Sequence, residues 1–131
     1  MGKSDDLARR AVACRHWRWA PGMLALDSCN EEHPARVIDD RRSVVYEDSD
    51  GAMHTGDVSR SDVPDLDDPA TLGALLALVR EAWGDPLICV AVDNTGAGWW
   101  VDGWTAARPQ VPSDLHPTEA DALVAALEAA P

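Results

Sequence analysis

A short segment near the N-terminus places arginine, histidine and tryptophan side chains next to one another, and three more tryptophans follow in one later stretch. A nucleobase can stack on tryptophan, and the guanidinium group of arginine donates paired hydrogen bonds to phosphate oxygens. We therefore expect these side chains to form a ligand-binding pocket. The eight candidate residues are Arg15, His16, Trp17, Arg18, Trp19, Trp99, Trp100 and Trp104.

Core packing is the competing interpretation of these tryptophans. The chain has six Trp, one Tyr and no Phe, so tryptophan must supply most of its aromatic packing. The alternation of Trp17 with Trp19, and the even spacing of Trp100 and Trp104, also fit the inward faces of strands. Aromatic stripes pack more often than they bind, and core packing is therefore the more frequent explanation.

Other residue types with reactive side chains are arranged less favourably. Cys14, His16, Cys29 and His33 are soft zinc ligands, but a Cys-x-His pair is tighter than the usual zinc spacing. Serines, cysteines and histidines occur without a nucleophile elbow or a Cys/His signature. We therefore expect no metal site, no other cofactor and no catalytic residue.

The charge is distributed unevenly along the 131 residues, whose formal net charge is −12. The first 20 residues hold five basic and two acidic side chains, and the remainder holds six basic and 21 acidic ones. The body of the protein thus carries −15 and the N-terminal segment +3. Such a surface repels a phosphate backbone, which argues against direct binding of DNA or RNA polymers. It allows a basic protein partner or a small anion at the N-terminal segment.

Three helices are expected to position these side chains. The first spans 4–14 with Ser4 as its cap. The second is the clearest element, because Asp68 is a capping residue, Pro69 suits the first helical position and Gly84 stands just past the end. The third begins after Thr118, with Asp121 three residues on, and has an apolar face. That face consists of Ala120, Leu123, Val124 and Leu127.

Strands and loops fill the remainder of the chain. Alternating and β-branched stretches predict strands, and polar or proline-containing stretches predict loops. We expect strands at 23–27, 36–38, 43–46, 87–93 (buried) and 99–105, with a hairpin turn at 94–98. We expect a loop at 28–34 and a mobile loop at 47–62 that contains a short strand near 52–55.

The order of elements lacks βαβ repeats. It predicts one α+β domain over residues 1–131, an antiparallel sheet with about three helices packed on one face. No signal peptide or membrane-length apolar run is present, and a cytoplasmic location without membrane association is expected.

Two stretches resemble a family of small uncharacterised proteins of tailed phages and prophages. They are ACRHWRWAPGM, which begins at Ala13, and PDLDDPATLGALLALVREAWG, which begins at Pro64. The C-terminal DALVAAL, from Asp121, is similar to the usual ending of that family. The resemblance implies a viral origin and a bacterial host cytoplasm. It implies no catalytic residue.

Three hypotheses follow. The first is a non-catalytic phage or prophage accessory protein, acting in counter-defence, that captures a small nucleotide-like ligand through an Arg/Trp pocket. The alternative is an acidic inhibitor that covers a host nucleic-acid-processing enzyme. The second alternative is a small hydrolase, which no spacing supports. The apolar helix faces also leave room for a homo-oligomer.

Overall fold

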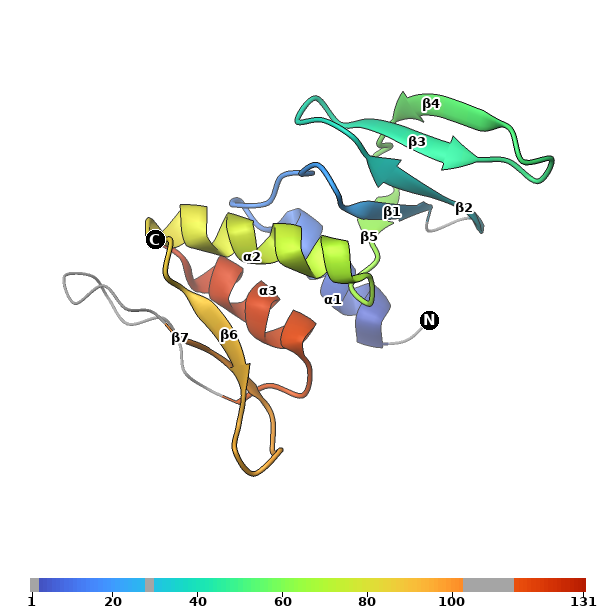
Figure 1. Cartoon of the computed structure of the whole chain (residues 1–131). Helices are drawn as coiled ribbons and strands as arrows, with labels where there is room; N and C mark the ends of the chain where they lie inside the picture. Colours follow the sequence, from blue (N-terminus) through green and yellow to red (C-terminus); the bar gives the residue numbers. More distant parts are fainter. Residues whose placement is uncertain (1–2, 28–29, 103–114) are drawn as a thin grey trace.

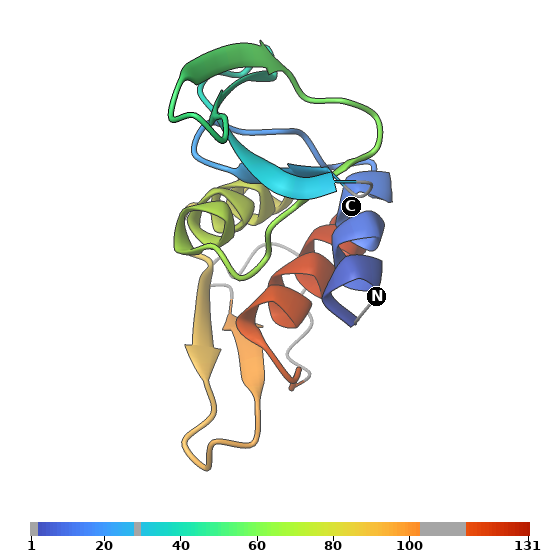
Figure 2. The same cartoon turned by 90° about the vertical axis from the view of Figure 1, so that its right-hand side faces the viewer.

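The computed structural model describes residues 3–27, 30–102 and 115–131, whose elements stack in three layers (Figures 1 and 2). A five-stranded antiparallel sheet forms the first layer, helices lie beneath it, and a two-stranded hairpin packs against the helices from the far side. The predicted α+β class, with an antiparallel sheet and helices on one face, is confirmed.

The three predicted helices are present as α1 (Lys3–Ala13), α2 (Pro69–Trp83) and α3 (Glu119–Ala129). Asp68 Oδ2 accepts a hydrogen bond from Thr71 N–H at 2.9 Å, and Gly84 ends α2 with a left-handed φ of +65°. Thr118 Oγ1 accepts from Asp121 N–H at 3.0 Å. Both predicted caps are therefore confirmed, whereas Ser4 lies in the first turn of α1 and not in front of it.

The large sheet has the strand order β4-β3-β2-β1-β5. Its strands are β1 (Leu24–Asp27), β2 (Asn30–Val37), β3 (Ser43–Glu47), β4 (Met53–Asp57) and β5 (Asp62–Pro64). The strands expected at 23–27 and 43–46, and the short one near 52–55, are confirmed. The mobility expected for 47–62 stays a prediction.

The loop expected at 28–34 is wrong in its greater part, because β2 begins at Asn30 and continues through Pro34. Strand β1 pairs Ala25 with Ala35 and Asp27 with Asn30, which leaves a register shift between the two pairs. Pro34 lies in this irregular stretch, where its missing N–H removes no regular ladder bond. Pairing with β1 therefore overrides the local preference for a loop.

The second hairpin consists of β6 (Cys89–Val92) and β7 (Trp99–Asp102) and forms a sheet of its own. The strand expected at 87–93 is present as β6, and the expected turn at 94–98 joins it to β7. The full burial expected for it is wrong, since Leu87 is 63% and Val92 is 53% exposed. Only one face of this narrow sheet meets α3. That face carries Val101 and Trp99, whereas Trp100 alternates with them along β7 and is half-buried.

The core lies mainly between α2, α3 and the strands above them. Leu75 and Val79 of α2 are fully buried, as are Leu123 and Leu127 of α3. The Nε1–H of Trp83 donates to Ala126 O at 2.8 Å and joins the two helices. All four residues of the predicted apolar face of α3 are buried. Among the described residues, no helix has both the length and the apolar character that crossing a bilayer requires.

Candidate functional site

A pocket of about 420 Å³ lies where the segment after α1 meets two loops of the large sheet. We call it the Trp–Arg pocket. Its apolar lining is Val12, Trp17 and Trp19. Its polar lining is Arg18, Asp40, Arg42, Ser59, Arg60 and Asp62. The pocket thus draws on the end of α1, the α1–β1 segment, the β2–β3 turn and the β4–β5 loop.

The α1–β1 segment is held as an irregular stretch between α2 and the strands β3 and β4 (Figures 1 and 2). Trp17 N–H donates to Cys14 O at 3.0 Å as the helix ends, and Gly22 N–H donates to Val37 O at 2.8 Å. Gly22 has a φ of +94°, which glycine adopts without a steric penalty. These bonds fix the segment at both ends.

The two tryptophans of the pocket differ in burial. Trp19 is only 7% exposed and belongs to the core, while Trp17 is half-buried and meets Trp19 edge-to-face at a centroid distance of 5.4 Å. The Nε1–H of Trp17 is buried and finds no acceptor among the described residues. An unsatisfied buried donor costs about 1–3 kcal/mol, so a bound acceptor that reached this atom would be favoured.

The β2–β3 turn presents Arg42 to the pocket. Asp39 Oδ1 accepts from the N–H groups of Ser43 (3.1 Å) and Arg41 (2.9 Å), and these bonds, that from Ser43 foremost, hold the pKa of Asp39 below its ordinary value. Arg42 has a φ of +71°, a left-handed conformation that is uncommon for residues other than glycine. Val58 N–H donates to Arg42 O at 3.0 Å, and Arg42 Nη2 donates to Val58 O at 3.2 Å. The turn is therefore tied to the β4–β5 loop.

The β4–β5 loop presents Ser59 and Arg60, and Asp62 follows as the first residue of β5. Asp62 Oδ2 accepts from Ser59 N–H at 2.9 Å, and Asp62 N–H donates to Ser59 O at 3.2 Å. This pair of bonds closes a tight turn around Arg60. The guanidinium group of Arg60 has no hydrogen bond or ion pair to any residue that the structure describes.

The three arginines of the pocket therefore differ in how many hydrogen bonds and ion pairs they make within the protein. Arg18 Nη2 lies 2.5 Å from Glu81 Oε2 on α2, but the two side chains are 50% and 64% exposed. Such an exposed ion pair is weak and exchanges readily for another anion. Arg42 has one hydrogen bond to a carbonyl, and Arg60 has no partner within the described part of the chain. The guanidinium groups of these arginines consequently keep N–H donors that a ligand can use.

The structure brings only part of the predicted site together. Trp17, Arg18 and Trp19 share the pocket, whereas Arg15 Nη2 and His16 Nε2 both lie 3.2 Å from Ala130 O, beyond the end of α3. Trp99 and Trp100 lie on β7 in the third layer and do not line the pocket. Trp104 lies outside the described residues.

Sequence reasoning missed the opposite wall of the pocket, formed by Arg42, Ser59 and Arg60. Only six basic residues follow the first 20 in this acidic chain, and two of them are Arg42 and Arg60. Because Arg42 and Arg60 are isolated cations among many carboxylates, the sequence offered this one indication that they could bind an anion. Nothing local, however, indicated that these two loops would face the segment after α1.

Two of the zinc-type residues considered from the sequence, Cys14 and His16, are described and do not line the pocket. Cys14 Sγ lies 3.7 Å from Leu127 O, the geometry of a weak hydrogen bond from a half-buried thiol. Within the described residues, no three His, Cys, Asp or Glu side chains are grouped so that they could hold a metal ion. Cys29 and the side chain of His33 lie outside what the structure describes.

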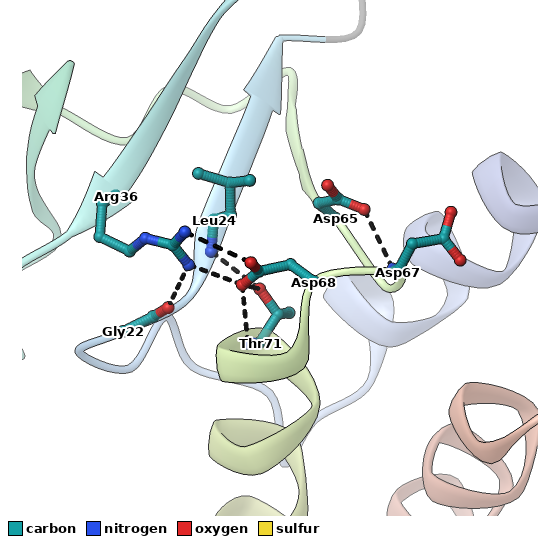
Figure 3. A network of polar contacts seen from close by, with 7 residues as sticks. All are labelled: Gly22, Leu24, Arg36, Asp65, Asp67, Asp68 and Thr71. Carbon is teal, nitrogen blue, oxygen red and sulfur yellow. Dashed lines mark hydrogen bonds and ion pairs between the residues drawn. The ribbon is translucent and has the colours of Figure 1, made fainter. Parts of the chain in front are cut away.

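A second polar cluster, the Arg36–Asp68 junction, joins β1 and β2 to the start of α2 (Figure 3). Arg36 Nη1 donates to Asp68 Oδ2 at 2.6 Å and to Gly22 O at 2.8 Å. Thr71 Oγ1 donates to Asp68 Oδ2 at 2.8 Å and accepts from Leu24 N–H at 2.9 Å. The bonds from Arg36 and Thr71 hold the pKa of Asp68 below its ordinary value. The polar groups here bond to one another, so the junction is structural.

No protein-family model matches the chain, and no curated protein or solved structure gives a significant match.

Proposed function

We propose that the protein is a non-catalytic binding protein whose Trp–Arg pocket captures a small nucleotide-like ligand. The observation that carries this proposal is the juxtaposition of two tryptophans with three arginines around about 420 Å³. That volume falls within the range of ligand pockets, roughly 300–1,000 Å³. A planar base stacks on an indole face, and arginine recognises phosphate oxygens in a planar, forked geometry.

The carboxylates in the pocket narrow the ligand class. Asp40 and Asp62 offset much of the positive charge of the three arginines, and Glu81 already pairs with Arg18. A polyphosphate or a nucleic-acid chain is disfavoured by these charges and by the −15 body of the protein. A nucleoside monophosphate or a cyclic mononucleotide fits better. Its phosphate suits the arginines, and its ribose hydroxyls or base amino group can donate to the aspartates.

The resemblance of the segments Ala13–Met23 and Pro64–Gly84 to phage and prophage proteins supports a biological setting for such capture. A small viral accessory protein that removes a nucleotide signal would act in counter-defence inside a bacterial host. The support is by analogy with that family.

The test is a thermal-shift and NMR titration with AMP, cyclic mononucleotides, ATP and a short single-stranded DNA. A ligand that binds the native state raises the melting temperature by mass action. We expect a shift with mononucleotides, accompanied by movement of the indole signals of Trp17 and Trp19. Signals of Trp100, on the far hairpin, should not move.

The matched variants are Arg60→Ala and Arg41→Ala. Both side chains are exposed and make no hydrogen bond or ion pair with a described residue, but only Arg60 lines the pocket. Loss of one phosphate-directed arginine should weaken binding about tenfold in Arg60→Ala and leave Arg41→Ala unchanged. A complete absence of shifts across the nucleotide panel, or equal effects of the two variants, would overturn the proposal.

A further inference from the structure

A second pocket, of about 570 Å³, is lined by residues at or near the N-terminal ends of all three helices. The N-terminal ends of these helices face the viewer in Figure 2. We call it the helix-start groove. Helix α1 contributes Leu7, and α2 with the loop before it contributes Leu66, Asp67 and Leu72. The start of α3 completes it with residues 117–121. It shares no lining residue with the Trp–Arg pocket.

The floor of the groove is apolar. Leu7, Leu66 and Ala120 belong to the buried core, and Leu72 packs against that core while still partly exposed. An apolar side chain inserted here would therefore extend the existing core and lose its contact with water. This burial is the usual source of binding energy at the centre of a protein interface.

The rim of the groove is acidic. The carboxylates of Asp67 and Glu119 have no hydrogen bond or ion pair to any described residue. Asp121 Oδ2 accepts from Thr118 Oγ1 at 2.6 Å. Figure 3 shows the side chain of Asp67 directed away from the Arg36–Asp68 junction, so Arg36 does not neutralise it.

The helix dipoles offset only part of the negative charge of the rim. Each helix N-terminus carries about +0.5 of an elementary charge, so three of them offset roughly half of three carboxylates. Arg10 pairs with Glu128 at 2.5 Å and also attracts the carboxylate of Asp121, whereas Asp67 and Glu119 have no basic partner among the described residues. The rim therefore stays negative and favours a cationic partner.

We propose that the helix-start groove docks a basic amphipathic segment of another protein, with an apolar anchor on the leucine floor and Lys or Arg on the acidic rim. This inference does not depend on nucleotide binding at the Trp–Arg pocket. A second copy of this chain is a poorer occupant, because its net charge of −12 would oppose association.

The probe is a synthetic helical peptide with a leucine stripe and lysines elsewhere, titrated into the labelled protein at ~0.15 M salt, where distant charges are screened. We expect its binding to move the backbone NMR signals of Leu7, Leu66, Leu72 and Ala120. A scrambled peptide of the same composition should bind more weakly, because its leucines no longer form one face. An equivalent leucine–glutamate peptide should not bind.

The matched variants are Asp67→Lys and Asp57→Lys, both at exposed positions and with the same change in net charge. Asp67 lines the groove, whereas Asp57 ends the edge strand β4 in the large sheet. Charge reversal at the rim should weaken peptide binding about fivefold or more, and reversal at Asp57 less than about twofold. Equal weakening, signal changes that map elsewhere, or equal binding of the scrambled peptide would each overturn the proposal.

Discussion

Arginine side chains take different parts in two polar regions of this molecule. At the Arg36–Asp68 junction, Arg36 donates to a carboxylate and a carbonyl within a network that fixes β1 and β2 on α2. At the Trp–Arg pocket, Arg60 has no partner among the described residues and Arg18 has only an exposed ion pair. The same residue type thus stabilises the fold in one place and leaves donors available in the other.

The difference lies in what surrounds each guanidinium group. The side chain of Asp68 is only 14% exposed and also receives two hydrogen bonds from Thr71, so each member of the junction restricts the others. Arg42 and Arg60 lie on turns and Arg18 on the irregular α1–β1 segment, and all three line the pocket. Satisfied polar groups indicate a structural role, and unsatisfied ones beside a pocket indicate binding.

The largest effect is expected from Asp68→Ala at the junction. This change removes the cap of α2 and leaves Arg36 without its carboxylate, so we expect the free energy of unfolding to fall by about 2–3 kcal/mol. Chemical denaturation measures the loss. The control is Asp67→Ala, which alters a neighbouring exposed carboxylate and should change stability by less than about 0.5 kcal/mol. Similar losses in both variants would contradict the structural role of the junction.

The next effect concerns pH. Because the pKa of Asp68 is lowered in the folded protein, its ionised form adds stability well above the unfolded pKa, roughly 3.9. That stability is lost as the pH falls through the folded pKa. Asp68→Asn keeps the cap and the size of the side chain but cannot ionise. We expect it to be less stable than the wild type at pH 7, with the gap closing below about pH 4.

Denaturation curves across this pH range measure the difference in free energy of unfolding between the wild type and Asp68→Asn. Other carboxylates titrate equally in both proteins, so their contributions cancel in the difference. A gap that stayed constant down to pH 3 would mean that the Asp68 charge contributes nothing to stability.

The two regions also differ in how far the sequence predicts them. Helix α2 was expected with its correct bounds, because Asp68, Pro69 and Gly84 act on the backbone within a few residues of themselves. The tryptophans and Arg18 were identified by residue type alone. Trp17, Arg18 and Trp19 are neighbours in the chain and share the pocket, whereas Arg15 and His16 contact the carbonyl of Ala130 instead.

The remainder of the candidate site depends on contacts that are distant in the sequence. Arg42 reaches the pocket through its two bonds with Val58, and Arg60 through the turn that Ser59 and Asp62 close. Strand β2 similarly includes Pro34 only because β1 pairs with it. No local propensity encodes such pairings, since they arise when tertiary packing selects among loop conformations.

The smallest effect is expected from Glu81→Ala. This variant tests whether Arg18 contributes to ligand binding or only to its ion pair with Glu81. Glu81→Ala releases Arg18 while placing a good helix former on the exposed face of α2, so stability should change by less than about 0.5 kcal/mol. If Arg18 then turns to a bound phosphate, affinity for a mononucleotide should rise about two- to threefold. The matched control is Glu128→Ala, which breaks the Arg10–Glu128 pair, also 2.5 Å long and exposed, with the same change in charge. Arg10 does not line the Trp–Arg pocket. A gain in affinity shared by both variants would therefore reflect net charge alone. No gain in affinity in Glu81→Ala would place Arg18 outside the binding site.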